Sequence, residues 1–188
     1  MKISIPNASS LAGLARAWRD LAVWTALSGI QVELGDRGLG SAKTRTFRGS
    51  DGDEYLTRAT IPGPLGCRLV VHRIHRGDED PHPHSHPWRW ARFLIASGGY
   101  DDERWTFDED RDPPWRETRT RMRPGDVNVV GAGDYHRVVD VLPRTTTLGL
   151  LGPDVQGWGF MIPDGMGEFV PWQEYLLRKK SGEGRLTW

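Results

Sequence analysis

The chain of 188 residues is long enough for one domain with a sizeable core, so its length requires no second domain. Its 25 lysines and arginines balance 25 aspartates and glutamates, which argues against a duplex-binding surface, and we expect no nucleic-acid partner. Cys67 is the single cysteine, so no intrachain disulfide can form. No stretch approaches membrane-spanning length. We therefore expect a soluble, cytoplasmic protein without a membrane partner.

The first element in the chain is predicted to be a helix within residues 1–29. Ser9 and Ser10 offer an N-cap, and Ser28-Gly29 ends the pattern. Between them the apolar residues recur at helical spacing, at Leu11, Leu14, Trp18, Leu21 and Trp24. This apolar face is expected to pack on the outside of a sheet or on a partner subunit.

From Ile30 onward short apolar segments alternate with Gly, Pro and Asp, which is typical of an all-β sandwich or barrel, here placed over residues 30–177. Gly35–Asp53 is predicted to be a mobile loop and Asp108–Pro114 a solvated hairpin end. The expected strands are Ile30–Leu34, Glu54–Ile61, Cys67–His75, Trp88–Ser97, Arg104–Phe107, Thr118–Met122, Val127–Val130, His136–Val141 and Thr145–Leu151.

The last part of the chain is expected to differ from the barrel. After Gly152 no further strand is predicted. Val170–Leu177 is predicted to begin a short C-terminal helix, and residues 178–188 are expected to form a tail.

Histidines supply the clearest chemistry. The stretch His82–His86 holds three alternating histidines, and His136 lies downstream. On a strand, side chains two residues apart share a face, so His84 and His86 are expected to point the same way. Together with His136 they could supply half of an octahedral metal shell and leave positions open for substrate. A closed structural zinc site would need more cysteines than Cys67.

Three further side chains are candidates for a catalytic role. His72 and His75 are expected on opposite faces of one strand, so one of them could line the pocket as an acid or base, or simply bond within the wall. Strict alternation from His86 would place Arg92 inward, where it could bind a carboxylate or phosphate; pairing with a nearby acid is the alternative. Tyr100 could donate to a metal-bound ligand or pack beside Gly98-Gly99. His82 is expected to be exposed.

These spacings resemble the two motifs of the cupin superfamily. In the first motif, HxH is followed after four residues by glutamate and after six more by glycine; here Ala91 occupies the glutamate position and Gly98 is in register. In the second motif, glycine, proline, glycine and histidine correspond to Gly125, Gly131, Gly133 and His136, with glycine replacing the proline.

More narrowly, the chain resembles small bacterial and phage cupin-like proteins. The shared segments are HxHPW at His84–Trp88, GGY at Gly98–Tyr100, PGD at Pro124–Asp126, WGF at Trp158–Phe160 and VPWxEYL at Val170–Leu176. The resemblance covers about residues 54–177 and implies a jelly-roll barrel, the double-stranded β-helix. It also implies a homodimer, as small cupins often form.

The resemblance also implies a class of activity. With alanine at the glutamate position, the implied metal ligands are His84, His86 and His136, an all-imidazole set similar to that of the thiol dioxygenases. This favours an Fe(II) dioxygenase-type oxidoreductase acting on a small polar or anionic molecule, although Zn, Ni, Mn or Cu would also suit imidazole. The alternatives are a metal-dependent isomerase, epimerase or lyase on a sugar or organic acid, and a non-catalytic ligand-binding cupin.

Overall fold

A computed structural model describes residues 43–49, 51–163 and 166–181. The N-terminal helix expected within residues 1–29, the strand expected at Ile30–Leu34 and most of the C-terminal tail lie outside these residues. Within them the chain is all-β apart from a 3-10 turn and one α-helix, which confirms the predicted class. No helix in this part of the chain combines the length and the apolar character needed to cross a membrane.

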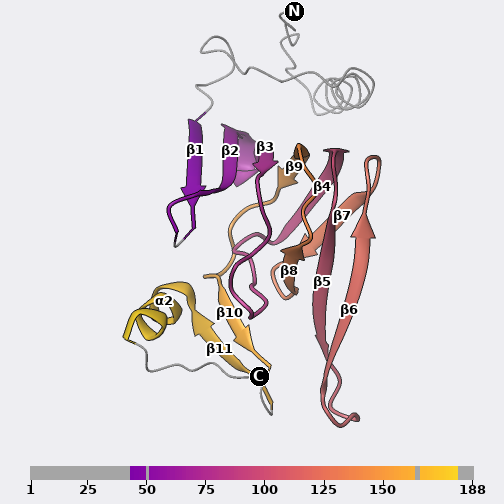
Figure 1. The fold of residues 1–188 in the computed structure, drawn as a ribbon, viewed down its shortest axis with the longest axis vertical. Helices are drawn as coiled ribbons and strands as arrows, with labels where there is room; N and C mark the ends of the chain where they lie inside the picture. Colours follow the sequence, from indigo (N-terminus) through magenta and orange to yellow (C-terminus); the bar gives the residue numbers. More distant parts are fainter. Residues whose placement is uncertain (1–42, 50, 164–165, 182–188) are drawn as a thin grey trace, which may run out of the picture.

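Turns and longer connections join the strands of the described residues, and the connection between β3 and β4 is a long one (Figure 1). In chain order the elements are β1 (Lys43–Arg48), β2 (Glu54–Pro62), η1 (Pro64–Gly66), β3 (Arg68–Ile74), β4 (Trp90–Ser97), β5 (Tyr100–Phe107), β6 (Trp115–Met122), β7 (Val127–Gly131), β8 (Tyr135–Val139), β9 (Thr145–Leu151), β10 (Gly159–Ile162), β11 (Glu168–Pro171) and α2 (Trp172–Ser181).

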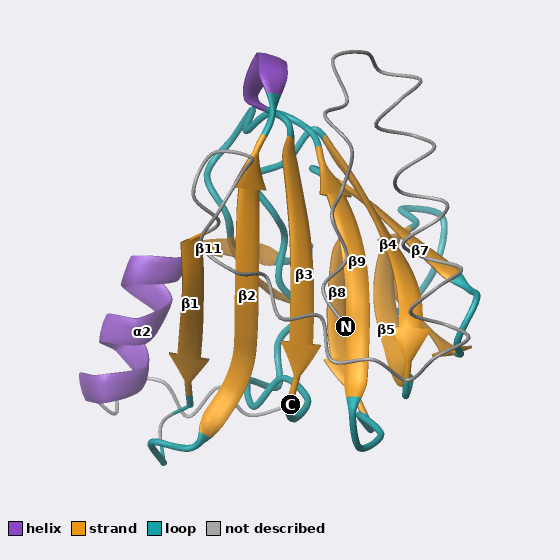
Figure 2. Cartoon of the chain, turned by 90° about the horizontal axis from the view of Figure 1, so that it is seen from above, coloured by secondary structure: helices purple, strands orange, loops and turns teal. Residues whose placement is uncertain are grey.

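The strands form two facing layers, as expected of a jelly roll. One layer is a six-stranded antiparallel sheet in the order β1-β2-β3-β9-β4-β7, seen face on in Figure 2. The other contains the three-stranded sheet β6-β5-β8 and the two-stranded sheet β10-β11. His84 connects these two smaller sheets, because it forms β-bridges to His136 of β8 and to Phe160 of β10. The sequence therefore folds into the predicted double-stranded β-helix.

Apolar side chains fill the space between the layers at both ends of a central pocket. One cluster joins the large sheet to the connection that precedes β4, and its members are Val70, Trp88, Ala91, Phe93, Val130 and Leu151. A second cluster lies around Ile74, Ile95, Tyr100 and Met122. Burial of this kind, at about 25 cal/mol per Å² of apolar surface, is the main stabilising term of such a sandwich.

The tight turn between β4 and β5 requires its glycines. Gly98 and Gly99 have φ angles of 70° and 145°, which residues other than glycine rarely adopt. A Cβ on Gly98 would also lie 2.6 Å from the Cα of Thr145. This turn delivers Tyr100 to the start of β5 and thus to the pocket.

Three predictions on the elements are corrected. Part of the expected loop Gly35–Asp53 is strand β1, which pairs with β2 along most of its length. Strands do continue after Gly152, because β10 and β11 pair with each other. The C-terminal helix begins at Trp172 and not at Val170, since Val170 is still the fully buried partner of Phe160 in that strand pair.

Candidate metal centre and its pocket

His84 and His86 lie in the connection between β3 and β4 and not within a regular strand. Backbone hydrogen bonds nevertheless hold this connection extended: the N–H of His84 donates to the carbonyl of His136 at 2.9 Å, and the N–H of Ser85 donates to Gly159 at 2.9 Å. The alternation expected of a strand is therefore kept locally. His84 and His86 face the pocket, while Ser85 is buried on the other side.

His136 of β8 completes the cluster. The ring centroids of the three histidines are separated by 4.9, 5.1 and 5.1 Å, close to an equilateral triangle. One ring nitrogen of each lies within 4.8 Å of the others. Protein–metal bonds to imidazole nitrogen are about 2.0–2.1 Å long, so small rotations of these rings would suffice for all of them to reach one ion. The structure thus brings together the three side chains that the sequence singled out.

Asp102 of β5 sets the orientation of His136. Its Oδ1 accepts a hydrogen bond from Nδ1 of His136 at 2.6 Å, and both side chains are buried. An ionised carboxylate can only accept here, so Nδ1 carries a proton and Nε2 is directed at the cluster. Nε2 of His86 lies 2.8 Å from Nε2 of His136. Asp102 in turn accepts from Nε of Arg104 at 2.6 Å.

Asp78 is a carboxylate close to His84. Its Oδ2 lies 3.7 Å from Nδ1 of His84 and accepts from the backbone N–H of Val138 at 2.6 Å. Its Oδ1 accepts a short hydrogen bond from the hydroxyl of Tyr55. Carboxylates behind metal-ligating imidazoles fix the ring orientation and increase the basicity of the ligand. His136 therefore has the hydrogen-bonded carboxylate typical of metal sites, and His84 has a carboxylate nearby that does not hydrogen-bond to it.

Burial favours the uncharged form of His84 and of His86. Desolvation lowers the pKa of His84, against the opposing influence of Asp78, and lowers the pKa of His86 well below its usual value of 6.5. A lowered histidine pKa means that the neutral ring persists as the pH falls below 6.5. Because only the neutral ring can coordinate a cation, these two side chains are ready to bind a metal at neutral pH.

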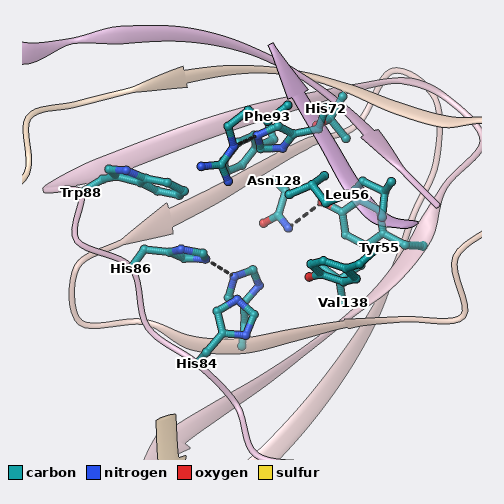
Figure 3. Close-up of a pocket in the computed structure, with 14 residues that line it drawn as sticks. Tyr55, Leu56, His72, His84, His86, Trp88, Phe93, Asn128 and Val138 are labelled. Atoms are coloured by element: carbon teal, nitrogen blue, oxygen red, sulfur yellow. Dashed lines mark hydrogen bonds between the residues drawn. The ribbon is translucent and has the colours of Figure 1, made fainter. Parts of the chain in front are cut away.

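A pocket opens in front of the histidines, between the two layers (Figure 3). His84 and His86 form one side of it, and His72 and Phe93 lie on the opposite side. Most of the remaining wall is apolar or aromatic. The lining residues are Tyr55, Leu56, Arg58, His72, Ile74, His84, His86, Trp88, Phe93, Tyr100, Asn128, His136, Val138 and Thr147. Such a wall excludes water and strengthens electrostatic interactions inside the pocket.

Two of the candidate catalytic residues line this pocket. Tyr100 is buried there, and its hydroxyl accepts a hydrogen bond from Nδ2 of Asn128 at 3.0 Å. Desolvation raises the pKa of Tyr100, so its hydroxyl keeps its proton at neutral pH. His72 is also buried in the wall, whereas His75 is exposed, so the two do lie on opposite faces of the sheet as expected.

The expectation for Arg92 is wrong. Arg92 is exposed and does not line the pocket, and the inward side chains of β4 are Ala91, Phe93 and Ile95. The alternation breaks before the strand begins, because Trp88 and Ala91 are both buried although they are three residues apart. The irregular turn at Pro87–Arg89 adds one residue to the alternating pattern, and this reverses the faces of the residues that follow. Arg92 therefore cannot contact a molecule bound beside the histidines.

Two other expectations from the motifs are also decided. His82 is buried and not exposed, and its Nδ1 lies 2.8 Å from the hydroxyl of Tyr175 in α2. Ala91, at the position where cupins have glutamate, belongs to the apolar core and does not line the pocket. The cluster therefore consists of imidazoles alone.

The sequence reasoning missed four polar residues of the site. Asp78 lies in a turn with no local signal of its role, and Asn128 and Tyr55 sit on strands among ordinary neighbours. Arg58 of β2 is the informative omission. It lies between Leu56 and Thr60 on one face of a predicted strand, and a charged residue at an inward position is itself a sign of a functional pocket.

Comparison with known proteins agrees with this architecture. No protein-family model and no curated protein matches the chain. The 7S globulin of Momordica charantia is 14% identical over 63% of this chain and 35% of its own, with a TM-score of 0.47. The DMSP lyase DddQ from Ruegeria pomeroyi is 18% identical over 66% of this chain and 63% of its own, with a TM-score of 0.46.

An uncharacterized Klebsiella pneumoniae protein with a double-stranded beta-helix domain is 19% identical, over 60% of this chain and 88% of its own, with a TM-score of 0.39. The chain thus spans about a third and two thirds of the lengths of the first two structures. At these identities the similarity concerns the fold, and neither metal nor substrate follows from it.

Proposed function

We propose that this protein is a metal-dependent enzyme acting on a small anionic molecule, with His84, His86 and His136 as the metal ligands. The observation that carries the proposal is the convergence of three imidazoles, with ring nitrogens within 4.8 Å of one another, on one wall of a pocket. Asp102, hydrogen-bonded to Nδ1 of His136, is the kind of carboxylate support that metal-ligating histidines typically have. Histidines that only filled space would need no such support.

The donor set suits a divalent transition metal, and Fe(II) is the favoured ion, with Zn, Ni, Mn or Cu as the alternatives. When bound, Fe(II) would supply the redox chemistry that a dioxygenase needs. The protein contributes the rest: Trp88 and Phe93 exclude water, and the protonated hydroxyl of Tyr100 can donate to an anionic group of the substrate. A dioxygenase-type oxidation is the reaction that we propose first.

A second candidate reaction is supported by Tyr55. Its hydroxyl lines the pocket and donates to Asp78, which makes this pair a route for moving a proton. An isomerase, epimerase or lyase would use such a pair while the metal acts as a Lewis acid. A ligand-binding protein without catalysis, the third alternative, would need neither oxygen nor proton transfer.

The test begins with the purified protein stripped of metal and then loaded separately with Fe(II), Zn, Ni, Mn and Cu. We expect elemental analysis to find about one ion per chain in the wild type and in His75→Gln, a matched control outside the cluster, and a loss of that ion in His136→Ala. Binding at 100 times Kd should stabilise the folded chain by about 2.7 kcal/mol and raise Tm accordingly. Equal uptake by His136→Ala would refute the metal site.

Oxygen consumption then separates the reactions. The Fe(II)-loaded protein, supplied with candidate small organic acids and thiols, should consume dioxygen if it is a dioxygenase. Metal-dependent turnover without oxygen consumption would favour the isomerase or lyase, and Tyr55→Phe should then abolish it. The predicted homodimer and cytoplasmic location stay predictions, and sedimentation analysis would decide the first.

A further inference from the structure

A polar row crosses the inner face of the large sheet, on the wall opposite the histidine cluster. Arg58 of β2 pairs in register with His72 of β3, and His72 pairs with Thr147 of β9. Residues that pair directly across antiparallel strands place their side chains on the same face. All three line the pocket. On β3 the neighbours of His72 on that face, Val70 and Ile74, are both apolar and buried.

Arg58 presents an uncompensated positive charge to the pocket. Its Nε donates to Nε2 of His72 at 2.9 Å, and its guanidinium lies 5.7 Å from the ring of Trp88 and 5.4 Å from that of Phe47. Among the described residues no carboxylate pairs with Arg58 and no acceptor takes its two terminal nitrogens. A half-buried guanidinium that lines a pocket without an anionic partner is suited to bind an anion there.

His72 orients this guanidinium and adds no charge of its own. Because its Nε2 accepts from Arg58, the ring is neutral with its proton on Nδ1. Burial and the neighbouring Arg58 both lower the pKa of His72 well below its usual value, in agreement with that assignment. The single positive charge of the row is therefore that of Arg58.

Thr147 supplies a second unused donor. Its hydroxyl oxygen is buried without a hydrogen-bond partner in the described part of the chain. Buried hydroxyls are nearly always hydrogen-bonded, so an unsatisfied one that lines a pocket indicates a group missing from it. Arg58 and Thr147 come from the two strands on either side of β3, which carries His72, and both side chains line the same pocket.

We propose that Arg58 and Thr147 form a carboxylate-binding subsite, with His72 as the residue that positions Arg58. A carboxylate fits better than a phosphate dianion, because one guanidinium balances one negative charge and its two terminal nitrogens match two carboxylate oxygens. Resting on the function proposed above, the subsite further identifies the substrate as a small organic acid. Its carboxylate is held across the pocket from His84 and His86, its apolar body lies against the aromatic wall, and its other end reaches the histidine cluster.

The experiment uses the metal-free full-length protein, so that its outcome does not depend on the metal site. Butyrate, neutral butyramide and inorganic phosphate are titrated in turn, by calorimetry and by fluorescence of the tryptophan set that includes Trp88. We expect butyrate to bind with one site per chain and butyramide to bind at least about tenfold more weakly, the effect of losing a charge-assisted hydrogen bond. Tighter binding of phosphate than of butyrate would overturn the carboxylate assignment.

Three variants test whether butyrate binds at Arg58 and Thr147 or elsewhere on the molecule. Arg58→Gln should weaken butyrate binding at least about tenfold, and Thr147→Val about two- to tenfold. Arg92→Gln, an exposed arginine on the same sheet, should bind as the wild type does. Circular dichroism and melting verify the folding of each variant, and Thr147→Val decides the matter should Arg58→Gln not fold.

The two proposals can fail separately. Butyrate binding that is unchanged in Arg58→Gln and Thr147→Val, or absent from the wild type, overturns the subsite and leaves metal uptake as it was. Metal uptake that is unaffected in His136→Ala overturns the metal site, and a butyrate response lost in Arg58→Gln would still establish the subsite.

Discussion

At the scale of single residues, the site depends on Asp102 as much as on the histidines. The sequence offers Asp102 only as a residue near a glycine turn, yet its carboxylate holds Nδ1 of His136 at 2.6 Å. Were this acceptor weaker, His136 could rotate or carry its proton on the nitrogen that faces the cluster. The orientation of His136 thus depends on Asp102 of the neighbouring strand β5. In the β5–β8 pair, the residue opposite His136 is Arg104.

This gives a prediction for Asp102→Asn. The substitution keeps the size of the side chain and removes the charge, so the affinity for Zn²⁺ should fall about 10- to 100-fold while the cluster itself remains. Competition with a chromophoric chelator measures this affinity. Asp110→Asn, in the exposed turn between β5 and β6, is the control and should leave it unchanged. An Asp102→Asn affinity equal to that of the wild type would contradict the supporting role.

The residues of the site differ in how far the sequence could reveal them. His84, His86 and His136 were predictable, because alternation and motif spacing are properties of the chain itself. Arg58 and Thr147 were not, because their meaning arises from the register of β2, β3 and β9, which the sequence does not state. Arg92 was placed wrongly since one irregular residue before a strand reverses every side chain after it.

At the scale of elements, most barrel strands were predictable, whereas β1 and the strands of the C-terminal unit were not. Thr145–Leu151, for example, was predicted with the bounds that the structure has. β10 and β11 are four residues each, too short for a periodic pattern. They are specified by packing instead: Phe160, Val170 and Tyr175 form one buried cluster, and Phe160 also bridges to His84.

This cluster yields a prediction on stability. Val170→Ala removes two buried methyl groups from a side chain that is 0% exposed, and should lower the free energy of unfolding by about 2 kcal/mol, from lost transfer energy plus a cavity. Leu177→Ala, whose side chain is 67% exposed in α2, is the matched control and should change it by less than about 0.5 kcal/mol. Urea unfolding measures both. Similar losses in the two variants would show that α2 and β11 do not pack as described.

At the scale of the whole molecule, the two layers enclose histidines whose protonation is unfavourable in the folded state. Burial lowers the pKa of His72 and of His86 well below 6.5, and it lowers those of His82 and His84 as well. The unfolded chain, by contrast, binds protons at these histidines near the usual pKa of 6.5. Acidification therefore favours the unfolded state.

The metal-free protein is accordingly expected to lose stability between pH 7.5 and pH 5.5. A histidine that stays neutral in the folded chain does not affect stability well above pH 6.5, where it is neutral in both states. By pH 5.5 it lowers the free energy of unfolding by about 1.4 kcal/mol, so His72 and His86 together account for about 2.8 kcal/mol. Arg58 lowers the pKa of His72 further, so His72 contributes even though its ring is hydrogen-bonded.

Carboxylates do not offset this loss within the same range. The pKa of Asp102 is already lowered from 3.8, chiefly by its hydrogen bond to His136 acting against burial, so its contribution is lost only as the pH falls below 3.8. Urea unfolding in the presence of EDTA at the two pH values measures the difference, and His72→Gln should reduce it by about 1 kcal/mol. A chain equally stable at both pH values would mean that these rings bind protons without unfolding, and that the pocket is open enough to hydrate them.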